Sequence, residues 1–225
     1  MGFPYSTKIV DRKIQADARN LKRLPLHIGL LVLESDFSYR DLANIIVWSI
    51  TMGVSHISVY DSNGEFKRNC NQLDEALTRS REEIQVSETN KYDICFHIHC
   101  PDNRGEENTG PYSSNQVNIH LLSLEDGRQS LTEVAKYLCQ DVQDKKQKIE
   151  DIKQCTVEKL IQDIYKFPDP DLVLKFGHTD SLMGFMPWQI RLTEILSLPS
   201  HRDLHYKTFL STLFLYGKME QRFGT

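Results

Sequence analysis

The sequence lacks the long apolar segment that a membrane-spanning helix needs. No run of about eighteen apolar residues occurs in its 225 residues. It also lacks a signal-peptide pattern and an Asn-x-Ser/Thr sequon, so nothing in it indicates a glycosylating compartment. The five cysteines are odd in number and scattered. They exclude a disulfide framework and are typical of a reducing compartment.

An excess of positive charge is missing as well. The formal net charge is −4, which excludes the strongly basic class of nucleic-acid-binding proteins. Basic residues gather only near the start, where Lys8 to Arg23 has apolar residues at helical spacing. We therefore separate a basic helical segment at 1–24 from a domain at 25–225. A solvated surface helix is the favoured interpretation of that segment, and a juxtamembrane segment near anionic lipid is the alternative.

Short apolar runs alternate with amphipathic stretches along the rest of the chain. This alternation predicts βαβ units, and hence an α/β fold with a mainly parallel central sheet flanked by helices. A helix from Asp36 or Ser38 to Met52, ended by Gly53, is expected between the first two strands. The expected strands are Leu26–Leu33, His56–Tyr60, Tyr92–His99, Val117–Leu122 and Leu172–Leu174. The other expected helices are Glu65–Glu88, Leu131–Lys146, Val157–Tyr165 and Lys207–Gln221.

One stretch near the C-terminus has the composition of a ligand site. The strand at Leu172 is followed by a polar loop from Phe176 to Gly184 and then by an unusually apolar block at 185–198. Ligands of α/β proteins usually bind in loops at the carboxyl ends of strands. On spacing alone, the favoured interpretation is that this stretch is only the last strand and helix of a core.

The residues of this stretch resemble the last motif of the cis-prenyltransferases, the family that makes undecaprenyl and dehydrodolichyl diphosphate. The matching residues are Asp171-Leu-Val-Leu-Lys175, Trp188-Gln189 and Glu194. The likeness extends over most of Leu26 to Gly224 and is weakest from 81 to 115. It is closer to the non-catalytic, Nogo-B-receptor-like subunits than to the catalytic ones. An N-terminal membrane anchor usually precedes the domain in such subunits, and it does not occur in this chain.

The resemblance implies a reaction that joins isopentenyl diphosphate to an allylic diphosphate with the help of Mg²⁺. Catalytic members place an Asp-Gly-Asn-x-Arg-Trp loop after the first strand. This chain keeps the leading His27 but has Leu33 or Glu34 where the aspartate falls. Asp36 and Arg40 are nearby, but no glycine lets backbone N–H groups converge on a phosphate. We expect the scaffold without the catalytic loop.

The loop after the strand at Leu172 is altered too. Catalytic members follow that strand with Arg-Thr-Gly-Gly-Glu-x-Arg-x-Ser, whereas this chain presents Asp180 in place of an arginine. Lys175 and His178 remain as weak phosphate contacts. Glu194 matches a position that binds metal in the family, but with its aspartate partner absent we expect a structural role. No metal site is therefore assigned to this chain.

The end of the chain carries the positive part of the resemblance. Arg222-Phe223-Gly224 matches an Arg-x-Gly motif that crosses the dimer interface in the family and completes the partner's isopentenyl diphosphate site. An arginine fork suits a diphosphate, and glycine allows close backbone approach. The apolar block is expected to supply part of the interface, since Trp and Arg are enriched there. The interface residues expected are Phe185, Trp188, Arg191 and Ile195.

The resemblance thus implies an accessory subunit of the dehydrodolichyl diphosphate synthase complex, inactive alone. It would stabilise a catalytic subunit that holds the Mg²⁺, and the complex would elongate farnesyl diphosphate for dolichol synthesis and protein glycosylation. The implied location is the cytosolic face of the endoplasmic reticulum membrane. An autonomous homodimeric prenyltransferase using Glu34 or Asp36 stays open, as does a receptor or adaptor pseudoenzyme.

Other polar residues are assigned no role in chemistry. Cys95, His97 and His99 alternate on a predicted strand and could hold zinc, but core or edge positions are favoured. His201 and His205 follow Pro199 and are expected at the surface.

Overall fold

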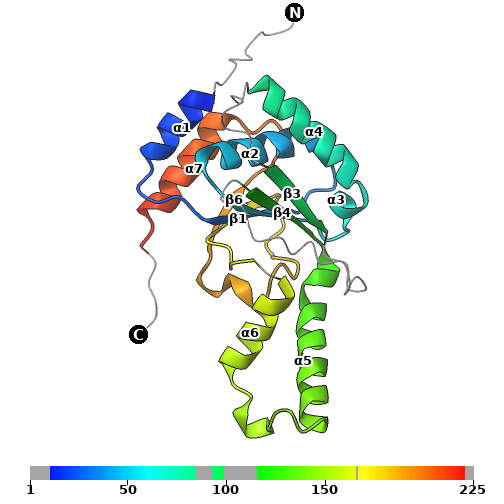
Figure 1. The fold of residues 1–225 in the computed structure, drawn as a ribbon. Helices are drawn as coiled ribbons and strands as arrows, with labels where there is room; N and C mark the ends of the chain where they lie inside the picture. The colour runs from blue at the N-terminus through cyan, green and yellow to red at the C-terminus, as the bar shows by residue number, and fades with distance from the viewer. Residues whose placement is uncertain (1–10, 85–92, 99–115, 166, 221–225) are drawn as a thin grey trace, which may run out of the picture.

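The computed structural model describes residues 11–84, 93–98, 116–165 and 167–220 as one parallel sheet with helices on both faces (Figure 1). The sheet is 6-stranded in the order β3-β4-β2-β1-β5-β6, and every neighbouring pair is parallel. This confirms the expected α/β fold. The strands are β1 His27–Val32, β2 His56–Tyr60, β3 Asp93–Ile98, β4 Gln116–Leu122, β5 Leu172–Phe176 and β6 Glu194–Leu198.

The central strands are buried on both sides, which explains their continuous apolar sequences. Every residue of β1 and β5 is buried. The register pairs Gly29 of β1 with Val173 of β5 and with Ser58 of β2. Parallel strands place all their carboxyl ends at one edge of the sheet, and the loops that leave this edge lie close together.

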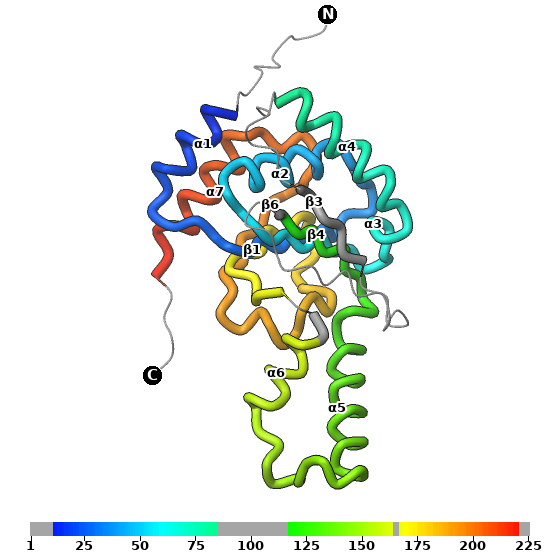
Figure 2. Tube along the Cα trace, in the orientation of Figure 1, coloured from blue at the N-terminus to red at the C-terminus, as the bar shows by residue number. Residues whose placement is uncertain are grey.

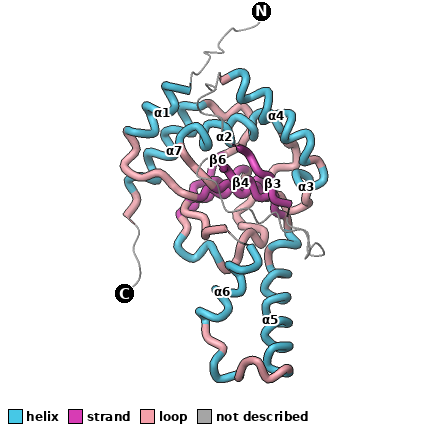
Figure 3. Tube along the Cα trace, in the orientation of Figure 1, coloured by secondary structure: helices cyan, strands magenta, loops and turns pink. Residues whose placement is uncertain are grey.

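Helices cover the two faces unequally (Figures 1 and 3). On one face α2 packs against α4 and α1, with α3 beside α4 and α7 alongside α1 and α2. On the other face α5 and α6 project away from the sheet as a pair, which the tube in Figure 2 shows clearly. The helices are α1 Asp11–Arg19, α2 Tyr39–Met52, α3 Glu65–Arg68, α4 Cys70–Glu83, α5 Arg128–Gln143, α6 Gln154–Tyr165 and α7 Tyr206–Lys218.

The ends of α2 follow the sequence prediction. The Ser38 side chain accepts a hydrogen bond from the backbone N–H of Asp41 at 3.2 Å and so caps the first turn. Gly53 ends the helix with φ of 107° and donates its N–H back to Ile50. Such a left-handed residue favours glycine, because a side chain would strain it.

Two expectations from the sequence are corrected. The strand at Leu172 does not close the sheet, since Glu194–Leu198 forms a further strand, β6, at its edge. The expected helix from Glu65 breaks at Asn69 into α3 and α4, and α4 ends at Glu83. In β6 the residues alternate between half-buried and exposed, as an edge strand requires, and this weakens the apolar signal.

The basic segment at the N-terminus packs onto the body of the domain. Ile14 of α1 is fully buried, and the Tyr206 hydroxyl donates to Asp17 at 2.8 Å. The α1 helix is therefore held against α2 and α7. Among the residues described, no helix is long and apolar enough to cross a membrane.

Candidate functional site

The loop after β1 occupies the place where the resemblance implies an aspartate in catalytic members of the family. Its Glu34 carboxylate accepts hydrogen bonds from the His201 backbone N–H at 3.0 Å and from Nδ1 of the same histidine at 2.5 Å. Partial burial by itself raises the pKa of Glu34, but hydrogen bonds from Ser200 and His201 outweigh it and lower that pKa. Glu34 is thus an ionised structural acceptor.

The His201 side chain is fully buried and joins two loops. Its Nε2 accepts from the backbone N–H of Ser38 at 2.9 Å. An acceptor nitrogen carries no proton, so the ring is neutral with its proton on Nδ1, facing Glu34. This corrects the expectation that His201 lies at the surface, whereas His205 is exposed as expected. No local sequence signal identifies the pair, because its members lie 167 positions apart.

Two charged residues that follow Glu34, one in the β1 loop and one in the first turn of α2, are also paired. Asp36 forms an ion pair with Arg202, from the loop after β6. Arg40 turns to α4 and pairs with Glu83 at 3.2 Å. The loop therefore offers no convergent pair of free carboxylates.

At the ends of β2 and β4, charged side chains bind the protein itself. Asp61 is 1% exposed, and its carboxylate accepts from the backbone N–H groups of Asn63, Glu65 and Phe66 at 2.8–3.1 Å. The Nζ of Lys67 lies 2.5 Å from Oδ2 of Asp126, with only 12% and 7% of the two side chains exposed. A buried cation with such a partner is not free to bind a diphosphate.

The loop after β5 gives its lysine a similar internal role. Lys175 is 7% exposed, and its Nζ donates to the carbonyl of Thr179 at 2.6 Å. His178 and Asp180 are exposed. Gly177 has φ of 102°, and a Cβ there would lie 3.0 Å from the carbonyl oxygen of Leu33. The glycine thus allows the β5 loop to lie against the β1 loop.

Beyond this loop the chain turns under the sheet and fills the space there. Phe185 is 1% exposed, and a Cβ on Gly29 would lie 2.9 Å from its ring. The Tyr60 hydroxyl donates to the Met183 carbonyl at 2.5 Å. Burial, with nearby Asp61 and Asp126, raises the pKa of Tyr60 to about 12. Phe185 is thus a core residue of this chain and is not available to a partner.

The other expected interface residues lie near the edge strand β6. Ile195 is 38% exposed on that strand, and Leu192 just before it is 57% exposed. Arg191 pairs with Glu158 of α6 at 2.9 Å, and its guanidinium carbon lies 5.7 Å from the centre of the partly buried Trp188 ring. These residues form a continuous segment beside an unpaired sheet edge.

Glu194 lies at the amino ends of the strands, whereas Glu34 lies at their carboxyl ends. It is the first residue of β6, in register with Leu172, the first residue of β5. Its backbone N–H donates to the Asp171 carbonyl at 3.1 Å. No cluster of three or more metal-ligating side chains occurs among the described residues.

Some sequence-predicted residues lie outside what the structure describes. Arg222, Phe223 and Gly224 follow its last described segment, which ends at residue 220. Cys95 and His97 do fall on β3, but the placement of their side chains, and of all of His99, is outside the described part.

Near the amino end of β1, His27 has a purely structural environment. Its Nδ1 donates to the Pro168 carbonyl at 2.6 Å, so Nε2 accepts from the Ser58 hydroxyl at 2.8 Å. Complete burial lowers the pKa of His27 to about 3. The histidine that leads the family's first motif is therefore a neutral core residue here.

Comparisons with known proteins agree with this scaffold. The family model described as "Putative undecaprenyl diphosphate synthase" matches residues 36–224. The mouse dehydrodolichyl diphosphate synthase complex subunit Nus1 is 41% identical over 212 residues, covering 93% of this chain and 69% of the relative. The human subunit NUS1 is 39% identical over 216 residues, covering 93% and 70%. An undecaprenyl diphosphate synthase of Pyrococcus furiosus is 26% identical over 209 residues, covering 84% and 76%.

Solved structures share the fold at low sequence identity. Lavandulyl diphosphate synthase from Lavandula x intermedia superposes with a TM-score of 0.64 at 19% identity, covering 90% of this chain and 99% of that one. A probable undecaprenyl diphosphate synthase from Campylobacter jejuni gives 0.58 at 19% identity, covering 90% and 100%. Because the family model matches residues 36–224, which are most of this chain, the chain belongs to the undecaprenyl diphosphate synthase family of cis-prenyltransferases.

Proposed function

We propose that this chain is the accessory subunit of a dehydrodolichyl diphosphate synthase complex and has no prenyltransferase activity alone. The observation that carries the proposal is that three charged side chains near the carboxyl ends of the strands, Glu34, Asp36 and Lys67, bind other residues of this chain. Glu34 binds His201, Asp36 pairs with Arg202, and Lys67 pairs with Asp126. The relatives at 39–41% identity are named as subunits of such a complex.

The residues at this edge do not fit the Mg²⁺ that the reaction needs. Mg²⁺ requires near-octahedral oxygen ligands, usually carboxylates with free lone pairs. One oxygen of Glu34 already accepts from His201, and Asp36 is tied to Arg202. We therefore assign the metal to the catalytic partner and route no step of the reaction through this chain's own carboxylates.

The proposed partner is a catalytic cis-prenyltransferase subunit, which docks on the β6 edge. Trp188, Arg191 and Ile195 lie there, and the edge strand leaves backbone groups unpaired. An exposed isoleucine beside a tryptophan–arginine pair has the composition of an interface centre. Binding of this surface would stabilise the catalytic subunit by mass action.

The C-terminal tail then completes the partner's site for isopentenyl diphosphate. Arg222 would bind the diphosphate with its planar fork, and Gly224 would donate a backbone N–H at close range, with Phe223 between them. The exposed His178 is a weaker phosphate contact of the same proposal. Lys175 would have to release the Thr179 carbonyl before it could take part.

The substrates of the complex would be farnesyl and isopentenyl diphosphates, and its product the dolichol precursor used in protein glycosylation. The proposed location of the complex is the cytosolic face of the endoplasmic reticulum membrane. The printed names of the mouse and human relatives support a role in a synthase complex.

Deletion of the tail tests this assignment against an adaptor role. The complex with the catalytic subunit would be assayed for polyprenyl synthesis with full-length chain, with Arg222–Thr225 deleted, and with Thr225 alone deleted as the matched control. We expect a loss of at least about tenfold in kcat/KM for the larger deletion and little change in the control. Full activity after the larger deletion would favour the adaptor and overturn the proposed role of the tail.

A further inference from the structure

The outer surface formed by α1, its linker and α7 is strongly basic in a chain whose net charge is −4. The two helices lie side by side: Tyr206 of α7 bonds Asp17 of α1, and a Cβ on Gly217 would lie 3.6 Å from the backbone nitrogen of Lys22 (Figure 1). We name this surface the basic face. Its exposed cations are Arg12, Lys13, Arg19, Lys22, Lys207 and Lys218.

None of these cations forms an ion pair with another residue of the described segments. By contrast, cations on α3 and α4 are paired, as in Arg68–Glu65 and Arg79–Glu75. The α7 sequence contains no acidic residue. Asp11 of α1 is buried, and Asp17 accepts from Tyr206. The cations of the basic face therefore outnumber its carboxylates, and they have no ion-pair partner in the described part of the chain.

The linker of the basic face contacts α7, and the face also carries apolar side chains. The Arg23 guanidinium carbon lies 4.1 Å above the Tyr216 ring, which clamps the linker to α7. Phe214 and Leu215 remain 37% and 50% exposed on α7, between the two lysines of that helix. Protein surfaces that lie on a membrane have this composition, with lysine and arginine around exposed phenylalanine and leucine.

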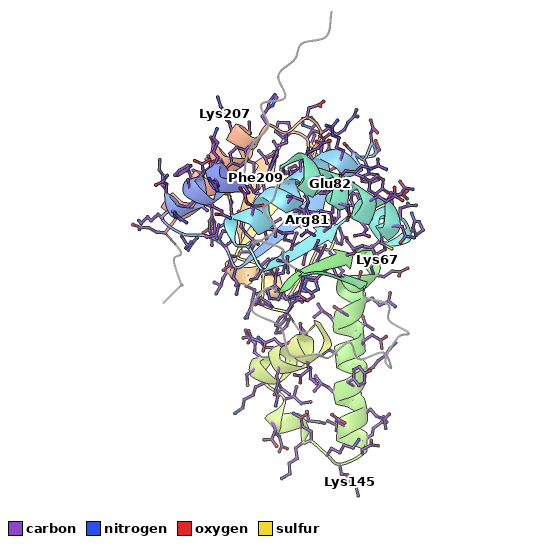
Figure 4. The ribbon with its side chains drawn as sticks, turned by 45° about the horizontal axis from the view of Figure 1, so that its top comes forward. Lys67, Arg81, Glu82, Lys145, Lys207 and Phe209 are labelled. Carbon is purple, nitrogen blue, oxygen red and sulfur yellow. The ribbon has the colours of Figure 1, made fainter. Side chains whose placement is uncertain are left out.

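We propose that the basic face of the folded domain binds an anionic membrane surface directly, in addition to any anchor outside this chain. These cations would meet lipid phosphates and carboxylates, while Phe214 enters the headgroup layer. In this orientation the α5–α6 pair points away from the bilayer, because Lys145 at its tip lies at the opposite end of the molecule from Lys207 (Figure 4). The inference does not depend on which partner docks at β6.

The test compares the 225-residue chain with a variant carrying Lys13→Glu, Lys22→Glu and Lys207→Glu. Co-sedimentation would use vesicles of phosphatidylcholine and vesicles in which about a third of the lipid is phosphatidylserine. The control variant carries Lys145→Glu, Lys148→Glu and Lys153→Glu. It has the same charge change on exposed lysines at the α5–α6 end. A milder set, Lys13→Gln with Lys22→Gln and Lys207→Gln, guards against misfolding of the first variant.

We expect the natural chain to bind the phosphatidylserine vesicles and the binding to weaken with salt. The affinity should fall about a hundredfold in the basic-face variant, which corresponds to about 3 kcal/mol at 1.4 kcal/mol per factor of ten. The glutamine set should fall less, and the α5–α6 control should bind like the natural chain. Equal binding to neutral vesicles, or equal loss in both glutamate variants, would overturn the proposal. A further control adds inorganic phosphate at the concentration of lipid phosphate in the vesicles, with the ionic strength held constant. Complete release of the chain from the vesicles under these conditions would also overturn the proposal, in favour of a soluble anion as the ligand.

Discussion

The Nδ1 atom of His201 lies 2.5 Å from Oε2 of Glu34, and this contact joins the loops that leave β6 and β1. It places a histidine–carboxylate pair where the resemblance implies an aspartate in catalytic members of the family. The same ring accepts from Ser38, the residue that caps α2. The contact therefore fixes the β1 loop from both sides and removes its acidic group from chemistry.

Replacing His201 by alanine should destabilise the protein. The change leaves the Ser38 N–H and the Glu34 carboxylate without their partner, and a buried unsatisfied group costs about 1–3 kcal/mol. For a chain of this size, each kcal/mol lowers the melting temperature by about 2–4 °C. Urea unfolding would measure the loss, with His205→Ala as the control because His205 is exposed. Equal stability of the two variants would refute a structural role for His201.

Breaking the Lys67–Asp126 ion pair should lower the free energy of unfolding by more than the loss of His201. Lys67→Met removes the cation beside the buried Asp126 carboxylate, which keeps its hydrogen bonds from Ser123. Breaking a buried ion pair in this way typically costs about 3–5 kcal/mol. Lys136→Met is the control, since the Lys136–Glu133 pair has a lysine that is 69% exposed, and such pairs contribute about 0–1 kcal/mol. The double variant Lys67→Met with Asp126→Leu should recover part of the loss in urea unfolding. No difference between Lys67→Met and Lys136→Met would contradict the burial of the pair.

His27 should make stability depend on pH. Its pKa is lowered from 6.5 to about 3 in the folded chain, so the unfolded chain binds more protons between these values. Stability is therefore fully present above pH 6.5 and falls as the pH drops towards 3. The free energy of unfolding should decrease from pH 7 to 5 by less in His27→Gln than in the natural chain. An unchanged slope in His27→Gln would count against the assignment.

An aspartate at Ile195 should weaken partner binding without unfolding the chain. Ile195 is 38% exposed on the edge strand, so the change costs the isolated chain little. At an interface centre it would place a charge in an apolar contact and cost more than about 1 kcal/mol, several-fold in affinity. The control is Ile149→Asp, at a site 73% exposed beside α6. Titration of each variant with the catalytic subunit would give the affinities. If Ile149→Asp weakened binding as much, the β6 edge would not be the docking surface.

The sequence predicted the sheet well because its central strands are short, continuous apolar runs. Leu172–Phe176 and His27–Val32 are buried on both faces, and their short length favours a strand over a buried helix. The edge strand Glu194–Leu198 escaped prediction, because exposed positions interrupt its apolar residues and a 3-10 turn at Gln189–Leu192 precedes it.

The candidate site was predicted mainly by what is missing from it. The absence of glycine and asparagine near Glu34 can be seen in the sequence alone. The contacts that hold these charged groups in place of the catalytic loop could not be predicted, because the partners of Glu34 and Lys67 lie 167 and 59 positions away. Phe185 shows the same limit: its composition fitted an interface, but the close approach of Gly29 draws it into the core.

Incorporation of labelled isopentenyl diphosphate onto farnesyl diphosphate with Mg²⁺ tests the central claim most directly. The assay would be run with this chain alone, with a catalytic cis-prenyltransferase subunit alone, and with both together. The account predicts no turnover by this chain alone and much stronger turnover by the pair than by the catalytic subunit. Turnover by this chain alone that is abolished by Glu34→Ala would contradict it, because Glu34 would then act in catalysis despite its bond to His201.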